Sequence, residues 1–66
     1  MSNLNPSDGK LGPQIFVLRV LLDFTQKELA NAVGVSIRTV KHWEAGTRNP
    51  SGSALILLRQ LRSSVG

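Results

Sequence analysis

The fold of this chain is decided by the stretch TQKELANAVGVSIRTVKHWEAG, which occupies residues 25–46. Its first residue, Thr25, is a good helix N-cap, and Glu28 stands three residues later, where it completes a capping box. Gly34 then provides the left-handed residue that commonly ends a helix. The stretch therefore predicts a helix that begins after Thr25 and ends before Gly34.

A second helix follows almost at once in the same stretch. Ser36 is in position to cap it, and Gly46 is in position to end it after about ten residues. Because the link around Gly34 is so short, the two helices must cross at a steep angle. A helix-turn-helix unit also needs a small residue where its helices touch and apolar residues that fix the crossing. In this sequence those positions hold Ala30, Leu29, Val33, Val35, Val40 and Trp43. The spacing therefore predicts a helix-turn-helix.

Helices are also expected on both sides of this unit. One begins after Gly12-Pro13, since proline suits a first helical turn. It ends near Asp23, an aspartate that tolerates the left-handed conformation. The other helix follows the next loop, is capped by Ser51 and runs to roughly Ser63.

The chain as a whole is expected to form one helical domain. Sixty-six residues leave room for a single small domain, and no segment alternates with period two for long enough to be a strand. Residues 1–13 are mostly polar and contain Asn, Pro, Ser and Gly, so we expect a flexible or loosely packed N-terminal arm. Residues 14–66 are expected to fold as an all-α domain, a small four- to five-helix bundle with the helix-turn-helix at its centre.

The helix expected at residues 37–45 separates its side chains by face. At about 100° per residue, Val40 and Trp43 point to one side. Ile37 and Glu44 lie at the flank of that side, and the opposite side carries Arg38, Lys41, His42 and Ala45. A short helix with such a basic, hydrogen-bonding edge fits the major groove of B-DNA, which is ~12 Å wide. The alternative is an ordinary solvated helix face.

Each of these outward residues suits a different contact with DNA. Arg38 can donate two hydrogen bonds to guanine, Lys41 can donate to guanine or phosphate, and His42 can bond a base edge or a phosphate. Ile37 could touch a thymine methyl group. We therefore predict these four residues as the base-contacting set.

The charge balance agrees with a polyanionic partner. The formal net charge is +4; residues 1–36 sum to zero, so residues 37–66 carry all of it. Nucleic acid is the first candidate partner and a membrane surface the second, whereas the alternative is a solubilising surface. The basic and apolar faces do not form one amphipathic helix, which argues against membrane binding.

Composition also excludes several kinds of protein. There is no cysteine and only one histidine, so we expect no disulfide, no metal site and no cofactor. No two side chains form a plausible catalytic dyad, so we expect no enzyme. The apolar runs are far shorter than a membrane span, and no signal peptide opens the chain. A cytoplasmic protein is therefore expected.

The motifs together resemble the lambda-repressor-like helix-turn-helix family of the Cro/C1 (XRE) type. The resemblance covers Ile15 to about Leu61 and rests on the segments TQKELA, GVS, TV and WEAG within residues 25–46. It implies a sequence-specific regulator of transcription, a repressor that binds a palindromic operator in double-stranded DNA as a dimer. It also implies a bacterial or phage-type protein.

The resemblance further implies roles for individual residues. Arg19 and Glu44 stand at the positions of a partly buried ion pair that is structural rather than catalytic. The positions matching Ile37, Arg38 and His42 face bases in the family. Contacts to DNA phosphates are expected from Thr25, Gln26, Ser36, Thr39, Arg48 and Asn49.

A more specific resemblance concerns the end of the chain. The run NPSGSA at residues 49–54, followed by Leu57-Leu58, is similar to segments of HigA-like antitoxins from toxin–antitoxin operons. This similarity favours an autorepressing antitoxin as one branch of the family.

Several large apolar residues fall outside the expected inner faces of the outer helices. Ile15, Leu18 and Leu22 form the inner stripe of the first helix, and Ala54, Leu57, Leu58 and Leu61 share a face of the last. Leu21 falls outside the inner stripe together with four residues that we predict to form a protein interface, Phe16, Val17, Val20 and Ile56. A homodimer is the simplest use of this surface, and a cognate toxin or another subunit is the rival. Alternatively, the N-terminal arm covers it with Leu4 and Leu11.

This surface supports an alternative function. The protein would then be an antitoxin or coregulator whose main role is to bind a partner protein through its apolar first helix. The two functions are compatible, because an antitoxin can bind DNA and a toxin.

Overall fold

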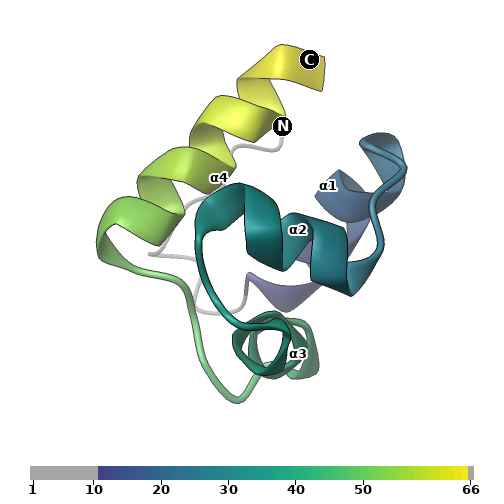
Figure 1. The fold of residues 1–66 in the computed structure, drawn as a ribbon. Helices are drawn as coiled ribbons and strands as arrows, with labels where there is room; N and C mark the ends of the chain where they lie inside the picture. Colours follow the sequence, from purple (N-terminus) through teal and green to yellow (C-terminus); the bar gives the residue numbers. More distant parts are fainter. Residues whose placement is uncertain (1–10, 66) are drawn as a thin grey trace.

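Four helices follow one another in residues 11–65, which are the residues that the computed structural model describes (Figure 1). They are α1 (Gly12–Leu21), α2 (Gln26–Val33), α3 (Ile37–Ala45) and α4 (Gly52–Val65). The all-α prediction is confirmed, and α2 and α3 form the predicted helix-turn-helix. Most of the predicted arm lies outside the described residues.

The predicted boundaries of the two central helices are confirmed by their caps. The Thr25 hydroxyl accepts a hydrogen bond from the Glu28 backbone N–H at 3.1 Å, and the Glu28 carboxylate accepts one from the Thr25 N–H at 2.8 Å. Ser36 caps α3 by accepting from the Thr39 N–H at 3.2 Å. The Thr25 hydroxyl satisfies an N–H group that a helix start otherwise leaves unpaired, whereas the Thr39 N–H also donates to the Ser36 carbonyl oxygen at 3.0 Å.

The first three helices all end in the same way. Asp23, Gly34 and Gly46 have φ values of 59°, 75° and 82° and turn the chain out of α1, α2 and α3. In each case the N–H of the next residue donates to a carbonyl in the last turn of the helix, as from Thr47 to His42 at 3.1 Å. This is the Schellman arrangement. Asp23 therefore adopts the left-handed conformation that glycine adopts at the other two helix ends.

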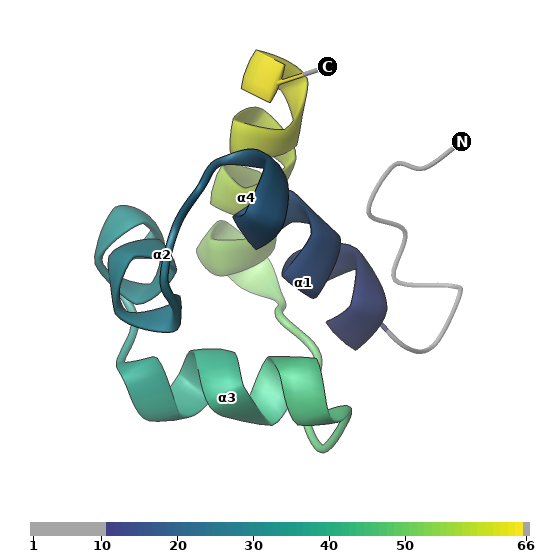
Figure 2. The same ribbon diagram turned by 90° about the vertical axis from the view of Figure 1, so that its right-hand side faces the viewer.

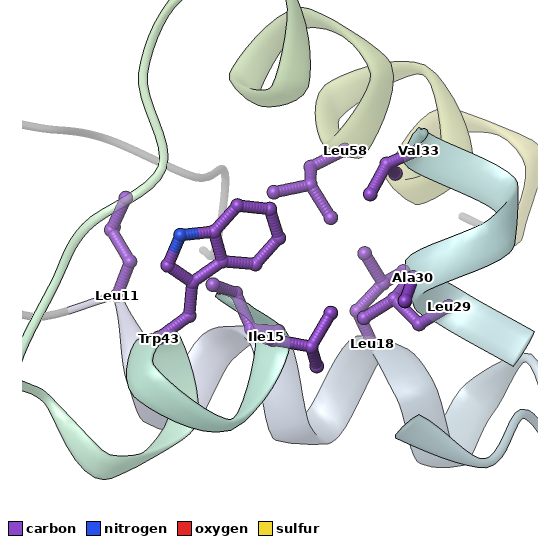
Figure 3. Close-up of a cluster of buried hydrophobic side chains, with 9 residues drawn as sticks. Leu11, Ile15, Leu18, Leu29, Ala30, Val33, Trp43 and Leu58 are labelled. Carbon is purple, nitrogen blue, oxygen red and sulfur yellow. The ribbon is translucent and has the colours of Figure 1, made fainter. Parts of the chain in front are cut away.

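Side chains from all four helices meet in one core. Its buried members are Leu11, Ile15, Leu18, Leu29, Ala30, Val33, Val40, Trp43 and Leu58. Figure 3 shows the Trp43 indole among side chains from α1, α4 and the residue that precedes α1. Leu11 is fully buried, so this residue belongs to the core although the sequence places it in the arm.

The orientation of α4 differs from the expectation. Leu58 is fully buried, and Leu55 is partly buried beside it, whereas Leu57 remains 36% exposed. The prediction that Leu57 shares the inner face is therefore wrong. Centring the helix on Leu58 turns Leu55 toward the core and Leu57 to its edge, because the two residues stand on opposite sides of Leu58 around the helix.

The helices place α3 at one end of the molecule. In Figure 2, α3 runs beneath α1 and α2, and the C-terminal end of α4 lies at the far side. Helix α3 packs against both α1 and α2. One side of α3 is thus fixed to the core, and no described element covers the other.

Candidate nucleic-acid interface

The uncovered side of α3 carries the predicted base-contacting residues. Arg38, Lys41 and Ile37 are exposed and His42 is half-buried, whereas Val40 and Trp43 on the other side are buried. The core therefore holds the helix by its apolar face and leaves a basic edge directed outward. This arrangement can insert polar side chains into a groove without rearrangement of the fold.

The structure brings Arg19 and Glu44 together. Arg19 Nε donates to Glu44 Oε2 at 2.8 Å, and Nη2 donates to Oε1 at 3.3 Å. Only 18% of the Arg19 side chain and 12% of the Glu44 side chain are exposed. Arg19 Nη1 also donates to the Phe24 carbonyl oxygen at 3.1 Å. Glu44 is the one carboxylate within α3, and it pairs with Arg19 of α1.

Gln26 takes part in this network, which the sequence did not predict. Its Nε2 donates to Glu44 Oε1 at 3.1 Å, so the first residue of α2 is tied to the last turn of α3. A primary amide has two N–H donors and one acceptor oxygen. The bond to Glu44 uses one donor, and the rest of the amide is compatible with the expected phosphate contact.

The other expected phosphate-contacting residues lie in two places. Thr25, Ser36 and Thr39 lie at the starts of α2 and α3; the Thr25 and Ser36 hydroxyls cap these helices, and Thr39 is within 3.1 Å of Ser36 Oγ. Arg48 and Asn49 are exposed in the loop after α3. Asn49 Oδ1 accepts a long hydrogen bond from the Leu11 N–H at 3.4 Å, which connects this loop to the start of α1.

The predicted interface residues are all exposed. Phe16, Val17, Val20 and Ile56 have exposed fractions between 50% and 58%, and Leu21 is equally exposed at 55%. Phe16 has a second role that the sequence did not reveal. The Arg19 guanidinium carbon lies 5.3 Å from the centroid of its ring, within cation–π range. Phe16 therefore supports the ion pair that holds Glu44.

His42 and Thr47 form a further pair that the sequence did not predict. The His42 Nδ1 atom lies 2.8 Å from Thr47 Oγ1, and the same hydroxyl donates to the His42 carbonyl oxygen at 3.2 Å. The available sequence signal was the glycine at position 46, because a Schellman ending brings the residue after the glycine back over the last turn.

A helix pair held in this way, with a basic edge on its second helix, defines a helix-turn-helix DNA-binding domain. A family model described as helix-turn-helix matches residues 16–61, more than half of the chain. The chain belongs to this family, the helix-turn-helix proteins of the Cro/C1 (XRE) type, which are DNA-binding domains and not enzymes. Neither the curated proteins nor the solved structures include a significant match.

Two further properties bear on possible partners. None of the helices in residues 11–65 is long and apolar enough to cross a bilayer. Over the same residues, no three side chains of His, Cys, Asp or Glu are grouped so that they could hold a metal ion.

Proposed function

We propose that this domain is a transcriptional repressor that binds a palindromic operator as a homodimer, with α3 of each protomer in the major groove. The observation that carries this proposal is the outer edge of α3, where Arg38, Lys41 and His42 project from a helix whose other side is buried. A helix is about 10–12 Å across with its side chains, which matches a groove of ~12 Å.

The contacts divide into those that discriminate sequence and those that supply affinity. Arg38 donates two hydrogen bonds to a guanine, and Ile37 contacts a thymine methyl group. Lys41 binds guanine or a phosphate, and Arg48 in the following loop binds a phosphate. The phosphate contacts position the domain and weaken as salt rises, whereas the base contacts select the site.

The size of the domain supports a dimer. The two recognition helices of such a regulator lie about one helical turn, ~34 Å, apart on DNA. The domain measures 26 × 25 × 19 Å, so one copy does not extend across two such half-sites but two adjacent copies do. The exposed apolar side of α1, with Phe16, Val17 and Val20, is the surface through which the copies would pair.

The same exposed surface favours a second candidate function, that of an antitoxin or coregulator. In this case α1 binds a different protein, such as a toxin, and DNA binding represses the operon that encodes both. The resemblance of residues 49–54 to HigA-like antitoxins supports this candidate. A stable complex with the product of a neighbouring reading frame, lost with Val17→Glu, would favour it over the homodimer.

Selection of bound sites from random duplex DNA tests the main proposal. The selected site should be a palindrome, and Arg38→Gln should weaken binding to it about 10- to 100-fold and relax the preference at one base pair of each half-site. Arg62→Gln is the matched control, because it removes the same charge from α4, away from α3 (Figure 2). We expect this control to change affinity only slightly.

One outcome would overturn the assignment of the recognition face. It is an unchanged affinity for the selected site after combined replacement of Arg38, Lys41 and His42 by alanine. Repression is tested by placing the selected site across a promoter that drives a reporter. Wild-type protein should lower its expression and Arg38→Gln should not.

A further inference from the structure

The two contacts between His42 and Thr47 share one hydroxyl group, and this limits where its proton can be. The Thr47 hydroxyl has a single hydrogen, and it lies 3.2 Å from the His42 carbonyl oxygen and 2.8 Å from His42 Nδ1. A carbonyl oxygen can only accept. Both contacts are therefore hydrogen bonds only if the hydroxyl donates to the carbonyl and Nδ1–H donates to the hydroxyl oxygen. This assignment follows from the hydrogen-bond network.

The backbone places Thr47 where it can make both bonds. Gly46 turns the chain at φ 82°, and the Thr47 N–H donates to the His42 carbonyl at 3.1 Å. In this type of helix ending, the residue after the glycine and the residue five positions before it commonly make an apolar contact. Here a hydroxyl and an imidazole occupy those two positions, so the contact is polar and directional.

We propose that Thr47 is a positioning residue that holds His42 as the Nδ1–H tautomer and so presents Nε2 as a hydrogen-bond acceptor to DNA. Within residues 11–65 Nε2 makes no hydrogen bond, and it lies across the ring from the nitrogen that Thr47 holds. In neutral imidazole one nitrogen donates and the other accepts. The inference rests on the proposed function, because it needs α3 to enter the major groove.

A hydrogen-bond acceptor at His42 Nε2 selects bases that present a donor in the major groove. In the major groove, cytosine and adenine each present an amino group as donor, whereas guanine and thymine present acceptors at the corresponding O6 and O4 positions. Neutral His42 in this tautomer therefore reads the amino group of cytosine or adenine. The opposite tautomer would donate from Nε2 to an acceptor, which is O6 or N7 of guanine, O4 of thymine or N7 of adenine, and so would no longer select for an amino group.

The tautomer is measured directly by nitrogen NMR on protein with labelled imidazole, at about pH 8.5, above the ordinary titration range of imidazole. His42 is the only histidine of the chain, so its signals need no further assignment. The wild-type protein and Thr47→Ser, which keeps the hydroxyl, should show protonated Nδ1. Thr47→Val, which has nearly the same shape without the hydroxyl, should shift the ring toward protonated Nε2.

Selection of bound sites with the same three proteins tests the effect on recognition. Wild type and Thr47→Ser should share a cytosine or adenine at one position of each half-site. Thr47→Val should lower that preference about three- to tenfold, the range that a single neutral hydrogen bond provides, and should keep the preference set by Arg38. Far-UV circular dichroism checks that Thr47→Val is folded.

The outcomes separate this inference from the proposed function. A wild-type ring protonated at Nε2, or a ring whose tautomer does not respond to Thr47→Val, overturns the role of Thr47 even if DNA is bound. A changed tautomer with an unchanged base preference also overturns the proposed reading of the base. Failure of the wild-type protein to bind any DNA overturns the proposed function itself and removes the base contact with it.

Discussion

Gly12 lies where the start of α1 meets the end of α3. A Cβ atom at this position would lie 2.6 Å from the Trp43 carbonyl oxygen and 2.9 Å from that of Glu44. Backbone atoms cannot turn aside as a long side chain can, so Gly12→Ala must move α1 away from α3. We expect the substitution to lower the free energy of unfolding, measured in urea, by about 1–3 kcal/mol.

This expectation runs against local propensity, which makes it informative. Alanine is favoured over glycine inside a helix by about 1 kcal/mol, so without the close approach Gly12→Ala would stabilise α1. Ser53→Ala is the matched control, since Ser53 is exposed on α4, and it should leave stability unchanged or raise it slightly. A Gly12→Ala protein at least as stable as wild type would show that α1 and α3 can accommodate a Cβ atom at this position without loss of stability.

The ion pair between Arg19 and Glu44 is a second feature whose contribution to stability can be tested with single substitutions. Removing one partner leaves a charge that is mostly shielded from water, as the 12% exposure of the Glu44 side chain shows. Arg19→Met should therefore lower the free energy of unfolding by about 1–3 kcal/mol, less than the loss for a fully buried pair. Combining it with Glu44→Leu should cost less than the two single changes added together. Strict additivity in this double-mutant cycle would mean that the two side chains are not coupled.

At the scale of whole elements, the ends of the two central helices are the part of the fold that the sequence predicts best. The capping box at Thr25, the serine cap at Ser36 and the left-handed glycines all act within a few residues of the chain. Such signals depend on hydrogen bonds between sequence neighbours, so no knowledge of the tertiary structure is needed to interpret them. The basic edge of α3 was predictable for a similar reason, because the helical period alone separates it from Val40 and Trp43.

Contacts between elements were less predictable. The rotation of α4 about its axis depends on how Leu58 meets the other helices, and a small rotation places Leu55 at the core in place of Leu57. The sequence predicts Gln26 as a phosphate contact and Phe16 as an interface residue, and it does not predict that both belong to the network around Arg19 and Glu44. Their roles follow from distances between helices that the local pattern does not contain.

The cap of α3 offers a test at this scale. Ser36→Ala removes the oxygen that accepts from the Thr39 N–H, so the free energy of unfolding should fall by about 1 kcal/mol. Amide exchange of Thr39 should become faster, because its N–H loses the Ser36 hydroxyl and keeps only the Ser36 carbonyl oxygen, 3.0 Å away, as an acceptor. Ser36→Asp should preserve most of the protection, since aspartate also caps helices well. Unchanged exchange at Thr39 in Ser36→Ala would contradict the capping role.

At the scale of the whole molecule, the net charge is less concentrated than the sequence halves suggest. Arg38, Lys41 and Arg48 lie on α3 and its following loop, but Arg59 and Arg62 belong to α4, which extends away from α3 (Figure 2). Pairing with Arg19 partly restores the contrast, because it offsets the negative charge of Glu44, the carboxylate that α3 itself carries. The field around α3 therefore results from where the helices pack as much as from composition.

The homodimer proposed above pairs through the apolar side of α1, and Val20→Glu tests this pairing. Val20 is 58% exposed and contributes nothing to the buried core, so the variant should fold normally. A buried carboxylate at the centre of a paired surface is costly, so the variant should sediment as a monomer where the wild type sediments as a dimer. Its affinity for a palindromic site should fall by at least about tenfold, while binding to an isolated half-site remains unchanged. Asn31→Asp, which adds one negative charge at an exposed position of α2, is the control and should stay dimeric. A wild-type protein that is monomeric both free and on its operator would show that α1 serves a different partner.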